Sequence, residues 1–147
     1  MLKKFKYIII IILILNFFNL TIASENFFHE AEKKYIKKKI EESKLLFQRN
    51  IVFNPKHAES YLYLAKIYNL EENKKKEQKN LNTALLLAPN NEEAIYMLIE
   101  LETKKSNYSK VKELTKKFEI NCRELCSEIE TIKDKLKNIE SKNESNK

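Results

Sequence analysis

The chain has 147 residues, which is enough for one domain, and it contains two prolines and no glycine. So few helix- and strand-breaking residues argue against sheets joined by tight turns and predict an all-α fold. The absence of glycine also excludes phosphate-binding glycine loops and the strained nucleophile turn of hydrolases. The formal net charge of +7 falls to +4 without residues 1–24, which is too mild to indicate a nucleic-acid partner.

Residues 1–24 have the pattern of an export signal peptide. Three lysines precede the apolar run Ile8–Leu15, and the small residues Ala23 and Ser24 suit cleavage by a signal peptidase. The alternative is an uncleaved anchor over residues 5–23, which is about long enough to span a bilayer. In both cases the lysines stay on the cytoplasmic side, so we expect an exported, periplasmic protein that is either released or held in the inner membrane.

Residues 25–57 carry a weak helical pattern. Phe28, Ala31 and Tyr35 are spaced i, i+3 and i+7, which places them on one face of a helix.

Residues 58–91 carry the clearest pattern. The apolar residues of the first half fall on one helical face, at i, i+3, i+4 and i+7: Tyr61, Leu64, Ala65 and Tyr68. Pro89 ends a second helix, because proline lacks an N–H and restricts the residue before it. Pro55 and Pro89 lie 34 residues apart. A fixed period of that length is the signature of stacked helix-turn-helix repeats, and the alternative is a helical hairpin with two coincidentally spaced prolines.

This stretch resembles a tetratricopeptide repeat. In the first helix, Tyr61, Leu64, Ala65 and Tyr68 stand at the family's large-aromatic, leucine, small and tyrosine positions. In the second helix and after it, Leu81, Ala84 and Pro89 stand at the aromatic, alanine and proline positions. Glu77 departs from the pattern, because the family usually has a small residue there. The resemblance implies an α-solenoid of about three repeats, at residues 24–57, 58–91 and 92–121.

The two outer repeats match the pattern less well. In the first, Glu30 stands where leucine is expected and Asn50 where alanine is expected. In the third, Phe118 stands where alanine is usual and no proline follows, while Asn90 or Asn91 is placed to cap the first helix. Terminal repeats are often atypical because one side has no neighbour.

Residues 122–140 are predicted to form a C-terminal helix with a narrow apolar seam, made of Leu125, Ile129, Ile132, Leu136 and Ile139. We expect this helix to cap the last repeat. The alternative is a coiled coil with a partner or with a second copy of the chain, which the same spacing would suit. The polar residues 141–147 are predicted to be a disordered tail.

Cys122 and Cys126 are the only cysteines, and an even count in an exported protein favours a disulfide. A regular helix holds Cβ atoms at i and i+4 too far apart, so the bond needs Cys122 at or before the helix start; the alternative is two free thiols. His29 and His57 have no partners at ligand spacing, and we expect both to be solvated. We therefore expect no metal, no cofactor and no catalytic residues, and the protein is predicted not to be an enzyme.

Lysines cluster where each repeat should turn from its first helix to its second. The clusters comprise Lys37, Lys38, Lys39, Lys74, Lys75, Lys76, Lys104 and Lys105. Such turns line up on one edge of a solenoid, so the clusters would form a basic ridge able to make weak contact with anionic membranes or acidic partners. The simpler interpretation is that they are ordinary solvated turn residues.

The resemblance also implies a binding surface, because the family usually binds on the concave face lined by the first helix of each repeat. The corresponding residues here are Phe28, Glu32, Tyr35, Leu62, Lys66, Asn69, Tyr96, Glu100 and Thr103. Their mixture of aromatic and charged groups suits a peptide or short helix laid in a groove. The alternative is a shallow, solvated face, or one covered by residues 122–140.

The sequence therefore predicts a non-enzymatic protein–protein interaction scaffold of the bacterial cell envelope, with a protein or peptide as its partner. Two alternatives stay open. One is an accessory subunit of a complex for envelope assembly or biogenesis. The other is a homo-oligomer, such as a homodimer, formed through the C-terminal helix.

Overall fold

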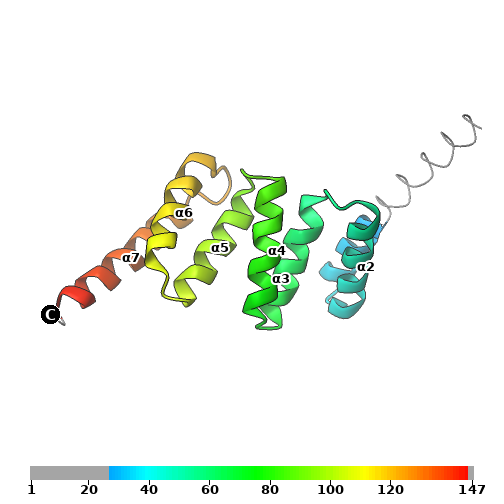
Figure 1. Cartoon of the computed structure of the whole chain (residues 1–147), viewed down its shortest axis with the longest axis horizontal. Coiled ribbons are helices and arrows are strands. Elements are labelled where there is room, and N and C mark those ends of the chain that lie inside the picture. The colour runs from blue at the N-terminus through cyan, green and yellow to red at the C-terminus, as the bar shows by residue number, and fades with distance from the viewer. Residues whose placement is uncertain (1–26, 146–147) are drawn as a thin grey trace, which may run out of the picture.

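The computed structural model describes residues 27–145, with side chains as far as residue 138 (Figure 1). Residues 27–36 are helical, and the helices that follow are α2 (Ile40–Phe53), α3 (Ala58–Leu70), α4 (Lys74–Leu87), α5 (Glu92–Lys104), α6 (Tyr108–Asn121) and α7 (Glu128–Ser145). These residues contain no strand, which confirms the all-α prediction for the described chain. The predicted signal or anchor segment lies outside the described residues. Among the described helices, none is both long and apolar enough to span a bilayer.

The helices recur with a 34-residue period. The second helices of successive pairs begin at residues 40, 74 and 108, and the first helices α3 and α5 begin at residues 58 and 92. The turns inside the α3/α4 and α5/α6 pairs lie at one edge of the array, and the connections between pairs lie at the opposite edge (Figure 1). The predicted solenoid of three helix pairs followed by a last helix is confirmed.

The turn inside each helix pair has the same unusual backbone. Lys38, Glu72 and Ser106 occupy the left-handed region, with φ values of 58°, 56° and 59°. In each turn the N–H of this residue donates to the carbonyl of the residue three positions earlier, and the N–H of the next residue donates to the carbonyl five positions earlier. In the middle pair, the Glu72 N–H donates to the Asn69 carbonyl at 3.0 Å and the Asn73 N–H donates to the Tyr68 carbonyl at 2.9 Å. These paired bonds satisfy carbonyl groups at the end of the first helix. Because the sequence has no glycine, three ordinary residues carry the conformation.

Side chains also cap the helix starts. The side chains of Asn73 and Asn91 accept the N–H groups of Lys76 and Ala94 at the starts of α4 and α5. His57 does the same for α3, and its ring lies 4.4 Å from the ring of Phe28, centroid to centroid. The prediction that His57 is simply solvated is therefore wrong, because its ring serves as a cap and as a packing partner.

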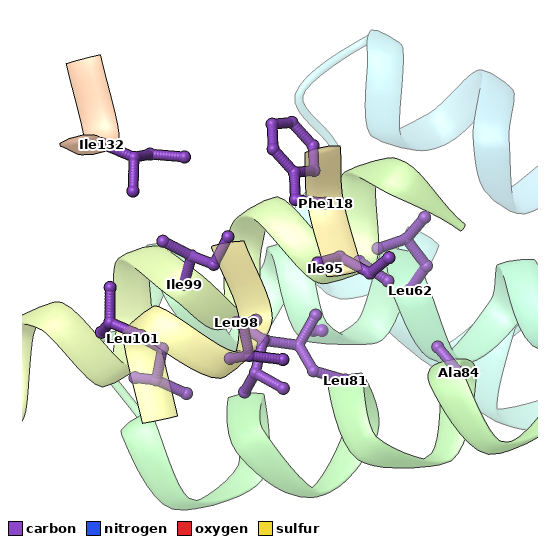
Figure 2. Packing of buried hydrophobic residues seen from close by; sticks show 13 residues of the cluster. Leu62, Leu81, Ala84, Ile95, Leu98, Ile99, Leu101, Phe118 and Ile132 are labelled. Carbon is purple, nitrogen blue, oxygen red and sulfur yellow. The ribbon is translucent and has the colours of Figure 1, made fainter. Parts of the chain in front are cut away.

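The core lies between the helix layers and falls into two clusters. The larger joins α3, α4, α5, α6 and α7, and Figure 2 shows its side chains converging from these helices. The smaller joins residues 27–36, α2 and α3 around Phe47 and Ile67. Ala65 and Ala84 are fully buried, as expected where helices approach closely. In the first pair the buried Asn50 donates its amide N–H to the Ser60 hydroxyl at 2.7 Å, while its amide oxygen is buried without a hydrogen-bond partner among the described residues.

Helix α7 covers the last pair. Ile132 is buried in the larger cluster, and Leu125, Ile129 and Leu136 pack against it; the side chain of Ile139 lies beyond those described. These four residues are used inside the chain, so the structure does not support a homodimer through this seam. Helix α7 continues to Ser145, across residues 141–145 of the tail that the sequence predicts to be disordered. No proline or glycine interrupts them, and extending an existing helix costs much less than starting one.

The connection between α6 and α7 is tied down twice. Cys122 and Cys126 form a disulfide, with both residues ahead of the first residue of α7 and their Cα atoms 5.2 Å apart. The carboxylate of Glu92, at the start of α5, accepts the N–H groups of Arg123 at 2.6 Å and of Glu124 and Leu125 at 3.2 and 3.3 Å. These bonds hold the pKa of Glu92 below its usual value, the bond from Arg123 having the largest effect. The loop therefore fixes where α7 begins.

Candidate functional site

A cavity of about 200 Å³ opens between the second and third helix pairs. We call it the inter-repeat cavity, and it is lined by Asn69, Glu77, Tyr96, Met97, Glu100 and Lys104. The residues come from α3, α4 and α5. The site thus brings together three residues predicted from the family resemblance, Asn69, Tyr96 and Glu100.

Glu77 is the buried carboxylate in the lining of the inter-repeat cavity. Its residue is only 2% exposed, and its Oε1 accepts a hydrogen bond from the Asn69 amide nitrogen at 2.8 Å. No ion pair joins it to a cation among the residues that the structure describes. A buried carboxylate that has only a neutral donor beside it is electrostatically expensive, and a bound cation would lower that cost.

The opposite wall of the cavity is held by α7. The Tyr96 hydroxyl donates to the Glu128 carboxylate at 3.2 Å, and the Lys135 ammonium lies 3.1 Å from Glu100. Partial burial raises the pKa of Tyr96, and the nearby carboxylates of Glu100 and Glu128 raise it further. The terminal helix therefore fixes these side chains instead of covering the cavity that they line.

The predicted residues of the first pair converge on Tyr63 of α3. Its ring lies 5.8 Å from that of Phe28 and 5.3 Å from that of Tyr35, both edge-on, while its hydroxyl donates to Glu32 at 2.8 Å. Burial raises the pKa of Tyr63, and the hydrogen bond to the Glu32 carboxylate adds to this effect. These side chains form a partly buried aromatic cluster between residues 27–36 and α3, the helix that also contributes Asn69 to the cavity.

The remaining predicted residues differ in accessibility. Leu62 is 1% exposed and belongs to the larger core cluster, so its assignment to the binding face is wrong; its side chain points into the helix layer. The Lys66 ammonium lies 2.7 Å from the Glu93 carboxylate and 4.5 Å from the centre of the Tyr63 ring. The Thr103 hydroxyl donates to the Ile99 carbonyl of its own helix at 2.8 Å.

Sequence reasoning missed four residues of this region: Tyr63, Glu77, Met97 and Lys104. Tyr63 and Met97 lie 34 residues apart, so the repeat period places them at the same position of successive first helices. Glu77 was visible as a departure from the family pattern, but only the fold shows that it faces a cavity. Lys104 was assigned to the basic ridge alone, although its side chain also borders the cavity.

The lysine clusters lie at the turns inside the helix pairs, as their positions predicted. Lys37, Lys38, Lys74 and Lys75 are exposed, and within the described chain none of them makes an ion pair. Lys104 is likewise exposed and without an ion pair in the described residues. The other three are engaged: Lys39 lies 3.2 Å from Glu42, Lys76 lies 5.2 Å from the centre of the Tyr68 ring, and Lys105 lies 2.8 Å from Glu102. The exposed apolar residues Ile36 and Leu70 end the first helices at this same edge.

No protein-family model matches the chain, and no curated protein matches it significantly. Solved structures do. The TPR domain of Sgt2 from Aspergillus fumigatus is similar with a TM-score of 0.69 at 16% identity, covering 81% of this chain and 82% of that one. The chain has the tetratricopeptide-repeat fold. A chain of the CopN–Scc3 complex is similar with a TM-score of 0.65, also at 16% identity, covering 74% of this chain and 68% of that one.

Proposed function

We propose that this tetratricopeptide-repeat protein is a non-enzymatic interaction scaffold of the bacterial cell envelope. It binds a peptide or short helix along the face formed by the first helices of the pairs, residues 27–36, α3 and α5. The observation that carries the proposal is the inter-repeat cavity, whose lining combines an aromatic ring, a thioether, an amide and charged groups. Mixed linings of this kind suit peptide side chains, with apolar parts giving affinity and polar groups giving orientation.

The binding face is also held in place before any partner arrives. Contacts between successive first helices fix its side chains, including Tyr63 to Glu32 and Lys66 to Glu93, and Lys135 of α7 holds Glu100. Binding then costs less entropy, because fewer side chains must be ordered.

Two observations support the envelope location. Residues 1–24 carry the signal-peptide pattern, and Cys122 is joined to Cys126 by a disulfide, a bond that persists in oxidising compartments such as the periplasm. Fractionation of cells that express the full chain tests this: we expect the protein in the periplasmic or inner-membrane fraction. Recovery in the cytosol with both thiols free would contradict the location.

Site-specific photocrosslinking tests the binding face. A photoreactive amino acid replaces Thr103, which precedes the cavity-lining Lys104, in one variant and Glu113, on the exposed side of α6, in the matched control. We expect a specific crosslinked partner from position 103 and none from position 113. Adding Glu100→Lys to the position-103 variant should weaken the crosslink. Equal crosslinking from both positions would place the partner elsewhere.

A second candidate function is docking of the basic turn edge on an anionic membrane. Ile36 and Leu70 are 72% and 61% exposed and end the first helices next to Lys37, Lys38, Lys74 and Lys75. Exposed apolar side chains at the same edge as unpaired lysines suit an interface with anionic headgroups, where each lysine contributes about 1 kcal/mol.

Vesicle sedimentation tests this candidate at low salt. We expect the protein to pellet with anionic vesicles, to be released by salt, and to lose binding when Lys37 and Lys74 are changed to Glu. The control changes Lys116 and Lys117 of α6 to Glu. Equal pelleting with neutral and anionic vesicles would rule out this docking.

A further inference from the structure

We propose that the inter-repeat cavity recognises a cationic side chain, the ammonium of a lysine or the guanidinium of an arginine, presented by the bound peptide. This inference rests on the proposed peptide-binding function and adds the chemistry of the residue that enters the cavity. The observation that carries it is the buried Glu77 carboxylate at the cavity wall, whose hydrogen-bond donor is the neutral Asn69 amide.

The electrostatics of the cavity favour a cation. Three of its lining residues are charged: Glu77, Glu100 and Lys104. Glu100 already lies 3.1 Å from Lys135, so its charge is compensated within the chain. Lys104 is exposed and makes no ion pair within the described chain. Glu77 is therefore the group that a ligand cation would neutralise, and a buried ion pair with good hydrogen bonds removes most of the cost of the lone charge.

The remaining lining suits an organic cation. Tyr96 places an aromatic ring beside the two carboxylates, and aromatic rings attract ammonium and guanidinium groups. Met97 offers a flexible apolar surface for the methylene stem that precedes the charge. No group of three or more His, Cys, Asp or Glu side chains that could hold a metal occurs among the described residues, so the lining fits a side chain and not a metal ion.

Methyl NMR gives a direct test, because the sequence has two methionines and Met97 is the one in the cavity. The protein carries a labelled methionine methyl group and is titrated with N-acetyl-arginine amide and N-acetyl-lysine amide. The uncharged N-acetyl-glutamine amide is the control at the same ionic strength. We expect a saturable shift of the Met97 signal with the cationic amides only.

Three variants test the assigned charges. Glu77→Gln keeps an oxygen that can accept from Asn69 but removes the charge, and it should weaken binding at least tenfold with an unchanged far-UV circular dichroism spectrum. Glu113→Gln, the matched control on the exposed side of α6, should bind as wild type. Lys104→Gln removes the opposing charge and should tighten binding several-fold. Equal binding of the neutral amide, or unchanged affinity in Glu77→Gln, would overturn the proposal.

A degenerate pool of synthetic dodecapeptides separates this inference from the proposed function. If peptides shift the Met97 signal and the bound fraction is enriched in lysine or arginine, both stand. If peptides shift the signal without that enrichment, the cavity binds peptides but the cation assignment is wrong. If no peptide in the pool shifts the signal, the proposed binding face is wrong and the inference falls with it.

Discussion

The left-handed turn residues give the sharpest prediction about stability. Lys38, Glu72 and Ser106 all have φ near +58°, where a Cβ atom meets the following carbonyl oxygen. This conformation costs an ordinary residue about 1–2 kcal/mol. Glycine avoids that cost but loses about 0.5–1 kcal/mol more entropy on folding. We therefore expect Glu72→Gly to stabilise the fold by about 0.5–1 kcal/mol, and the three substitutions together by about 2 kcal/mol, since the turns lie in different helix pairs.

Thermal and urea unfolding followed by circular dichroism would measure the change. For a chain of this size we expect a rise in Tm of roughly 3 °C for Glu72→Gly and roughly 8 °C for the triple variant. Glu72→Ala is the matched control: it also removes the glutamate side chain but keeps the Cβ atom, so its stability should stay close to wild type. If the glycine and alanine variants had the same stability, backbone strain at these turns would not be the cause, and the reasoning would fail.

Three further predictions concern the core and the terminal loop. Leu81→Ala should destabilise the fold by about 2–5 kcal/mol because Leu81 is fully buried, whereas Leu86→Ala, at an exposed site on the same helix, should change stability by less than about 0.5 kcal/mol; urea unfolding would show both. The pKa of Glu92 in the folded state lies below its usual value. The ionised carboxylate therefore stabilises the fold at pH values above the ordinary pKa, and this stabilisation is lost as the pH falls through the lowered, folded-state pKa. Wild type should therefore lose more stability than Glu92→Gln between about pH 5 and pH 3, and parallel curves would contradict a role for Glu92 in holding the loop. Replacing Cys122 and Cys126 by serine should cost roughly 2 kcal/mol, the value expected for so short a loop, and unfolding of wild type with and without reductant checks it.

The repeat period was readable because it depends on residues close together in sequence. Pro55 and Pro89 fixed its length, and the i, i+3, i+4, i+7 spacing of Tyr61 to Tyr68 identified the first helix of the middle pair. Where single residues departed from the pattern, the sequence could not say how the fold would accommodate them. Asn50 is hydrogen-bonded in the core and Phe118 is buried against the ring of Tyr96, 5.9 Å away.

The binding face was harder to read from sequence. The family resemblance named Asn69, Tyr96 and Glu100, which do line one cavity, but it also named Leu62, which is buried. Neighbouring positions on one helix face differ in exposure, because side chains of the adjacent helix pair cover some of them and not others. The spacing of residues along the sequence does not contain that information. The burial of Glu77 could not be predicted from sequence either, because a glutamate in the first turn of a helix is ordinarily solvated.

The sequence by itself determined the helical class, the 34-residue repeat and the number of helix pairs, since each follows from local spacing and from the scarcity of helix-breaking residues. The tertiary structure decided the rest. Stacking of the second and third pairs buried Glu77 at a cavity wall, and the packing of α7 directed its apolar seam into the chain and left that cavity open. Burial and charge compensation depend on side chains that meet only after the helices pack, so these features appear only in three dimensions.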